Sequence, residues 1–235
     1  MNWLPLDPTH DEEEFGKPLP NQIAEYIAKQ IFQGLFIPGE RLKEEELAKM
    51  FHTSRAPVRE ALYLLQIDGL VERLPRRGTV VRAYTEREIN ELYEVRLNLE
   101  QLAVDKLRSH WTEEAHAAFQ EVLEHMQSAL AEGNSEHYSS QNTLFHYLLF
   151  RTADSEILTR LYLQLTHPLQ PLLQFSTQTR EQMQNSFGEH QEIVQCLAGR
   201  QFDLAKDLIS KNVHHGLERA VVSAQKAKGE LNNQK

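Results

Sequence analysis

The spacing of apolar residues changes within residues 54–81, and this change limits the folds open to the chain. The first half of the segment carries a helix face at three- and four-residue intervals, formed by Val58, Ala61 and Leu65. Ser54 is a preferred helix N-cap, and Pro57 stands in the first turn, where its missing N–H is tolerated. After Gly69 two short apolar and β-branched runs, LVERL and GTVVRA, flank PRR. The segment therefore predicts a capped helix followed by a small β-hairpin.

Two more helices are expected before this segment. Isoleucines recur every fourth residue over 19–35, and residues 44–51 form a second, shorter helical pattern after a Pro-Gly break. Helix, helix, capped helix and hairpin is the order of a winged helix-turn-helix, whose third helix lies in the major groove of DNA. A DNA-binding domain is predicted.

The remaining chain keeps a helical period without strand-like alternation. Its first long helix carries apolar residues with mostly polar ones between them: Ile89, Leu92, Val95, Leu99 and Leu102. Further helices are expected at about 112–132, 135–152, 155–175, 179–199 and 202–226. The fold class is mainly α, an N-terminal winged helix-turn-helix followed by an all-α helical bundle. The expected divisions are a disordered arm (1–18), the winged helix-turn-helix (19–82), a linker (83–86), the helical domain (87–228) and a tail (229–235).

Charge is distributed unevenly along the chain. The net charge is −9, yet residues 19–82 carry ten basic and eight acidic side chains. Arg55 and Arg59 are four residues apart and share the helix face opposite the apolar stripe, so both guanidinium groups are expected to reach DNA while the acidic side chains lie elsewhere. The predicted DNA-binding residues are Ser54, Arg55, Arg59, Arg76, Arg77, Gly78 and Thr79.

Other functions find less support in the sequence. No Gly-rich phosphate loop, nucleophile elbow or paired catalytic carboxylates are recognisable, so an enzyme is not expected. No apolar run is long enough for a membrane helix, no secretory signal opens the chain, and a single cysteine, Cys196, fits a reducing compartment. A cytoplasmic protein without a membrane partner is expected. The alternative is a dimeric winged-helix scaffold that contacts proteins and lacks small-molecule control.

Residues 31–81, IFQGLFIPGERLKEEELAKMFHTSRAPVREALYLLQIDGLVERLPRRGTVV, resemble the DNA-binding domain of the GntR family of bacterial transcription regulators. Later stretches, including VRLNLEQLAV, NTLFHYLL and GEHQEIVQCLAGRQFDLAKDLISKNVHHGL, resemble the FCD effector domain of the FadR-type subgroup. The resemblance implies a homodimer, more often a repressor, that binds an inverted repeat in double-stranded DNA. It also implies release by a small-molecule effector, often an organic acid, in the helical domain.

The resemblance also implies a divalent metal held by one Asp and three His. Laid on this chain, those positions are Asn142, His146, His190 and Asn212. Amide oxygens are weaker ligands than a carboxylate, so weak metal binding is predicted; if a metal is held, His146 and His190 are its ligands. The alternative for both histidines is a hydrogen-bonded place in the bundle interior.

Arg96 is a further candidate, because the family commonly turns a basic residue of this helix toward an acidic effector. Its alternative is an ordinary ion pair with Glu100, worth about 0.3–0.5 kcal/mol. The effector-binding residues expected are Arg96, Asn142, His146, His190 and Asn212.

Overall fold

The computed structural model describes residues 16–175 and 177–233. The chain divides into two compact units, Met1–Tyr84 and Thr85–Lys235, which are called here the first unit and the helical unit. The expected arm lies outside the described residues as far as residue 15, and so do residues 234–235 of the expected tail. None of the described helices is long and apolar enough to cross a membrane.

Three helices are described in the first unit. They are α1 (Leu19–Phe32), α2 (Glu44–Met50) and α3 (Arg55–Ile67). Ile23, Ile27 and Ile31 of α1 are buried as their spacing predicts, and they pack against α3. The helix ends before the expected residue 35, because Gly34 adopts a left-handed conformation with φ of 72° that terminates the helical path.

A three-stranded antiparallel sheet completes the first unit. Its strands are β1 (Arg41–Leu42), β2 (Val71–Leu74) and β3 (Gly78–Val81), in the order β1-β3-β2. The hairpin of β2 and β3 is the predicted one, with Leu74 paired to Gly78 beside the turn. Strand β1 was not expected, because two residues are too short to show an alternation. The unit is a winged helix-turn-helix, which confirms the predicted fold class for this part.

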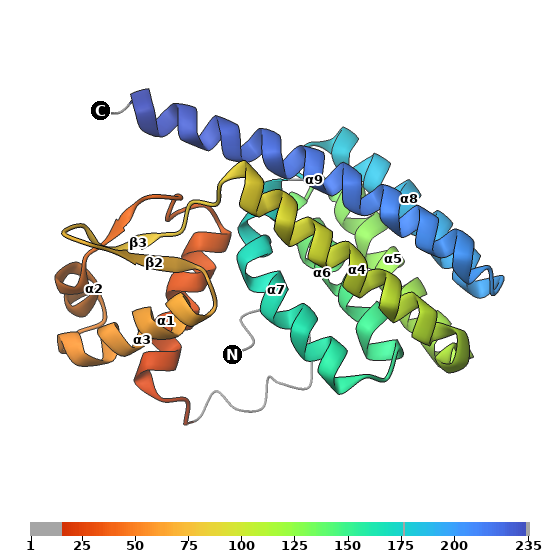
Figure 1. Cartoon of the computed structure of the whole chain (residues 1–235), viewed down its shortest axis with the longest axis horizontal. Coiled ribbons are helices and arrows are strands. Elements are labelled where there is room, and N and C mark those ends of the chain that lie inside the picture. Colours follow the sequence, from red (N-terminus) through yellow and green to blue (C-terminus); the bar gives the residue numbers. More distant parts are fainter. Residues whose placement is uncertain (1–15, 176, 234–235) are drawn as a thin grey trace. The chain divides into compact units, whose positions relative to one another are not determined.

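The helical unit confirms the rest of the predicted fold class (Figure 1). Its described helices are α4 (Glu86–His110), α5 (Glu113–Glu132), α6 (Ser135–Thr152), α7 (Glu156–Phe175), α8 (Arg180–Ala198) and α9 (Phe202–Asn233). Several starts are fixed by side-chain caps: Thr85 and Thr179 form capping boxes with Glu88 and Gln182. Helix α9 continues beyond the expected residue 226 and includes residues 229–233 of the expected tail, where a single glycine among helix-forming residues does not end it.

Helix α6 contacts α4, α5, α7 and α8, while α4 runs along α9. The buried face of α4 differs from the expected stripe. Ile89 is buried, but Val95 and Leu102 are about half exposed, at 50% and 47%. The face turned inward instead carries two ionisable side chains, Arg96 and Glu100. The interior of the helical unit therefore contains charge at a place where the apolar pattern alone predicted none.

Candidate functional site

Helix α3 presents its arginines to solvent. Its inner face is formed by Val58, Ala61, Leu62 and Leu65, all buried. The side chains of Arg55 and Arg59 lie on the opposite side and are 53% and 63% exposed. The structure thus places both guanidinium groups where a polyanion can reach them, as the helical spacing predicted.

The acidic side chains were expected to lie away from these two arginines, and this expectation was wrong. Glu45 of α2 forms an ion pair with Arg55, and Glu44 accepts a hydrogen bond from Arg59 Nε across 2.7 Å. The reason is geometric: α2 and α3 pack against each other across a short turn, so the first turn of α2 lies beside the outer face of α3. Both predicted DNA-binding arginines of α3 therefore have a carboxylate partner.

Ser54 occupies the N-cap position of α3 in an extended conformation, but its side chain makes no cap hydrogen bond. The hydroxyl and the first N–H groups of the helix are therefore open to an anion. An open hollow of about 610 Å³ adjoins this helix end. Its lining combines basic and polar side chains with one acid and one alanine: Glu45, Ala48, Lys49, His52, Thr53, Ser54 and Arg55.

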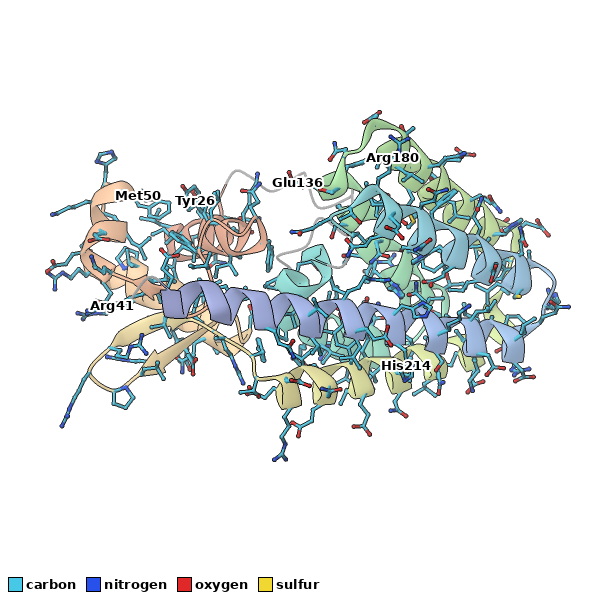
Figure 2. The ribbon with its side chains drawn as sticks, turned by 90° about the horizontal axis from the view of Figure 1, so that it is seen from above. Tyr26, Arg41, Met50, Glu136, Arg180 and His214 are labelled. Atoms are coloured by element: carbon cyan, nitrogen blue, oxygen red, sulfur yellow. The ribbon has the colours of Figure 1, made fainter. Side chains whose placement is uncertain are left out.

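The turn of the β2–β3 hairpin presents Arg76 and Arg77, both exposed. Arg76 has φ of 63° and Gly78 has φ of 78°, so two residues of this tip adopt left-handed conformations. Thr79 follows on β3 and is half-buried. Sequence reasoning missed Arg41 of β1 (Figure 2), whose guanidinium lies 3.6 Å from the point that a Cβ on Gly78 would occupy. Arg41 became recognisable only once β1 was seen to pair with β3.

The second candidate site is a buried polar cluster in the helical unit. Arg96 Nε donates to Glu100 Oε1 across 2.6 Å, and His146 Nδ1 donates to Glu100 Oε2 across 2.9 Å. All three side chains are almost completely buried. Burial alone would raise the pKa of Glu100, but His146 and Arg96 hold it down to about 2. Burial is the largest influence on Arg96 and opposes its charge, but Glu100 together with Tyr162 and Tyr93 more than offsets burial and keeps the pKa of Arg96 above its ordinary value.

The structure contains the ion pair that was the alternative for Arg96, while contact of Arg96 with an effector stays a prediction. The ion pair with Glu100 exists, but it is internal, unlike the solvated pair that the spacing predicted. A buried charge that loses its counter-charge strongly destabilises the fold. Arg96 is therefore held in the interior with its charge already balanced by Glu100.

His190 of α8 is held in one tautomer. Its Nδ1 lies 2.6 Å from the carbonyl oxygen of Ser186, which can only accept, so Nδ1 carries the proton and Nε2 presents a lone pair. Burial, together with the nearby His146, lowers the pKa of His190 to about 3, and burial likewise lowers that of His146. The two rings lie 5.3 Å apart between centroids. Both imidazoles are therefore neutral near pH 7.

The amides of the expected metal site are buried with these rings. Asn142 precedes His146 by one turn of α6, and the side chain of Asn212 of α9 lies close enough to His146 to influence its pKa. Asn212 Nδ2 donates to Glu189 Oε2 across 2.7 Å, and Glu189 also binds His215. His214, two residues beyond Asn212, lies on the exposed side of α9 (Figure 2).

This donor set does not fit a tightly held divalent metal. The Nδ1 atoms of both imidazoles already have hydrogen-bond partners, Glu100 for His146 and the carbonyl oxygen of Ser186 for His190. These bonds leave Nε2 of each ring as the nitrogen that could bind a metal. The remaining two positions are neutral amides, and the amide nitrogen of Asn212 already donates to Glu189. No carboxylate replaces the missing charge at positions 142 and 212. Sequence reasoning missed Ser186 and Glu189, although Glu189 directly precedes His190.

Comparison with known proteins identifies the two units. Residues 19–81 match the family profile described as "Bacterial regulatory proteins, gntR family", and residues 91–215 match the "FCD domain". The Gluconate operon transcriptional repressor of Bacillus licheniformis is 27% identical over 202 residues, which cover 84% of this chain and 81% of the relative.

A second relative is the uncharacterized HTH-type transcriptional regulator YdhC of Bacillus subtilis (strain 168), 37% identical over 142 residues. That match covers 59% of this chain and 63% of the relative, less than two thirds of its length. The solved structure of E. coli McbR/YncC superposes with a TM-score of 0.75 at 22% identity, covering 88% of this chain and 98% of that one, and it supports the fold. The chain belongs to the GntR family of bacterial regulatory proteins, in the FadR subgroup with an FCD domain, and is a DNA-binding transcriptional regulator, not an enzyme.

Proposed function

We propose that this chain is a cytoplasmic, dimeric repressor that binds an inverted-repeat operator and leaves it when a small organic acid enters the helical unit. The buried polar cluster around His146 and His190 is the observation that carries the proposal. A stable bundle needs no such interior, because apolar residues of similar volume are often as stabilising. A site that binds a polar ligand does need buried polar side chains. Repression follows the relatives, among them the gluconate operon repressors of two Bacillus species.

Buried polar atoms near the cluster indicate what the effector must offer. His190 Nε2, Ser139 Oγ and Arg219 Nε have no hydrogen-bond partner among the described residues. An unsatisfied buried polar group costs about 1–3 kcal/mol, so water or a ligand meets these atoms in solution. The His190 lone pair accepts from a hydroxyl, whereas Ser139 and Arg219 can donate to a carboxylate. A small hydroxylated carboxylic acid combines both groups.

The proposed acid does not depend on Arg96 as its main partner. The charge of Arg96 is already paired with Glu100, so an effector carboxylate would have to compete with an internal ion pair. Arg219 lies at the α8–α9 side of the bundle, near the hydroxyls of Tyr93 and Tyr138. It supplies a permanent charge for the effector without breaking the Glu100 pair.

The dimer is proposed to form along α4. Leu92, Val95, Leu99 and Leu102 repeat at intervals of three, four and three residues on its outer side. Such a repeat forms a seam between two helices. Ile157 and Leu161 of α7, which packs against α4, are also exposed, at 74% and 48%. A second copy of the chain that covers this outer side would remove the exposed apolar area from water and set two α3 helices on one inverted repeat.

One experiment tests the effector proposal. Native protein is denatured, the released small molecule is identified by mass spectrometry, and that compound is added to a gel shift with a DNA duplex selected by the protein from a random library. We expect a hydroxylated acid that releases the duplex, and weaker release with Arg219→Gln than with wild type. A co-purified acid that leaves the complex intact would contradict the effector role.

The dimer is tested separately by sedimentation. Val95→Glu with Leu102→Glu is expected to give a monomer, whereas Leu204→Glu, a leucine of similar exposure on α9, serves as the control. A wild type that sediments only as a monomer while it binds DNA would contradict the dimer.

A further inference from the structure

The two carboxylates that meet the recognition arginines bind different nitrogen atoms. Glu44 accepts from Arg59 Nε, the nitrogen inside the side chain. Glu45 meets Arg55 at a terminal nitrogen, Nη2. A guanidinium group that is held at Nε keeps its two terminal nitrogens for an end-on contact. A guanidinium group that is held at a terminal nitrogen has part of that same fork occupied.

The two acids also differ in exposure. The Glu44 side chain is 28% exposed, whereas the Glu45 side chain is 63% exposed. An ion pair between exposed side chains is weak, so the Glu45 pair opens readily in water. Glu45 and Arg55 both line the hollow at the start of α3, where Ser54 and the free N–H groups offer an anion site. A DNA phosphate that enters this hollow replaces the Glu45 carboxylate as the partner of Arg55.

We propose that Glu44 and Glu45 act in opposite directions on DNA binding: Glu44 positions Arg59 to read a base, and Glu45 opposes phosphate binding by Arg55. This inference rests on the proposed DNA-facing role of the two arginines. It goes beyond that role because it assigns specificity to acidic residues of the preceding helix.

The role of Glu44 follows from the geometry of guanine recognition. Guanine offers two acceptors, O6 and N7, to the fork of an arginine. A free arginine side chain loses rotamer freedom when it makes this contact. Glu44 holds Arg59 at Nε and so reduces the rotamer freedom that is lost on binding. This effect is the same whatever DNA sequence approaches. Only an operator that places guanine in front of the fork gains from the fixed geometry.

The role of Glu45 follows from charge. Its carboxylate stands beside the hollow that a phosphate would enter, and like charges at close range repel. Any DNA sequence meets this repulsion, since phosphates carry no sequence information. Glu45 thereby lowers affinity for all sequences alike, and a specific site retains its advantage through the base contact of Arg59.

The test compares Glu44→Gln and Glu45→Gln in the full chain. Glu46→Gln is the matched control, because it removes the same charge from the same helical turn while Glu46 pairs with Lys43 and not with α3. The probes are a duplex selected from a random library by the wild type and a scrambled duplex of equal length, measured by fluorescence anisotropy at several salt concentrations. Circular dichroism checks that each variant is folded.

We expect Glu44→Gln to weaken binding of the selected duplex about tenfold and to leave the scrambled duplex nearly unchanged, consistent with partial loss of one base contact. Arg59→Lys, which keeps the charge without the fork, should lose discrimination in the same way. Glu45→Gln should tighten both duplexes about three- to tenfold and steepen the salt dependence by about one charge.

Two outcomes would overturn the inference while leaving the DNA-facing role intact. One is a shift of selected-duplex affinity in the same direction for both glutamate variants. The other is a Glu45→Gln variant that behaves like Glu46→Gln. The double variant Arg55→Ala with Arg59→Ala decides the underlying role: if it binds the selected duplex as wild type does, the arginines do not face DNA and both proposals fail.

Discussion

Glu100 on α4 joins two helices through its two oxygens, since it accepts from Arg96 within its own helix and from His146 on α6 across 2.9 Å. The carboxylate is fully buried and ionised, and it balances the charge of Arg96. The same helix carries an identical spacing in solvent, where Arg87 pairs with Glu91. These two pairs differ in burial and not in sequence separation, which makes them a matched comparison.

Glu100→Gln is therefore expected to destabilise the helical unit far more than Glu91→Gln. The first variant leaves the Arg96 charge buried without a counter-charge, at a cost of about 3–5 kcal/mol. The second removes an exposed, solvent-screened pair that contributes little to stability. Urea unfolding followed by Trp111 fluorescence, in a Trp3→Phe background, measures both free energies of unfolding. Equal losses for the two variants would show that Glu100 does not hold Arg96 in the way described.

The buried imidazole of His190 makes the helical unit sensitive to acid. The pKa of His190 is lowered from 6.5 to about 3, so the unfolded chain binds a proton that the folded chain does not bind between these values. Stability therefore falls as the pH drops below 6.5, by about 2 kcal/mol at pH 5. In the presence of a chelator, His190→Gln should flatten the dependence of the unfolding free energy on pH between 6.5 and 5. Identical slopes in variant and wild type would contradict a neutral buried His190.

The arginines of α3 and of the hairpin tip are expected to contact different parts of the DNA. Arg59→Ala should cost about 1–3 kcal/mol on a selected duplex and little on a scrambled one, as for a base contact. Arg77→Ala should weaken both duplexes equally and lower the salt slope by about one, as for a phosphate contact. Fluorescence anisotropy over a salt series separates the two patterns. Arg87→Ala, an exposed arginine of the helical unit, is the control and should change neither value.

The sequence predicted the order of the elements because each element is specified locally. The capped pattern that begins at Ser54 and the helical periods after residue 87 depend on neighbouring residues alone. The two-residue strand β1 escaped, because its pairing with β3 is fixed by tertiary contact and leaves no period in the sequence.

The candidate sites were predictable only in part. Spacing placed Arg55 and Arg59 on one outer face, yet it could not show that α2 brings Glu44 and Glu45 against them. The resemblance brought Asn142, His146, His190 and Asn212 into consideration, while their outer partners became visible only in the folded bundle. The pairing of carboxylates with cations across helices depends on how the helices pack, and residue spacing in the sequence does not show this packing.

The last prediction concerns metal binding. Asn142 and Asn212 remove one negative charge and one imidazole from the site that the family resemblance implies, so wild-type protein purified without chelator should contain little tightly bound divalent metal. Asn142→Asp with Asn212→His should raise Zn²⁺ affinity by orders of magnitude. The outer partners favour this gain, because Glu100 and Ser186 already orient His146 and His190, and Glu189 can accept from a new imidazole at position 212 as it now accepts from the amide.

Metal analysis and zinc titration of wild type and double variant, side by side, measure the difference. Asn142→Ala with Asn212→Ala is the control, since it removes both amides without adding a ligand and should bind no more metal than wild type. Stoichiometric metal in the wild type would contradict the prediction and would direct attention to Glu189 and His215, the pair of potential ligands next to Asn212. A double variant that gains no affinity would show that the bundle does not bring the four positions within reach of one ion.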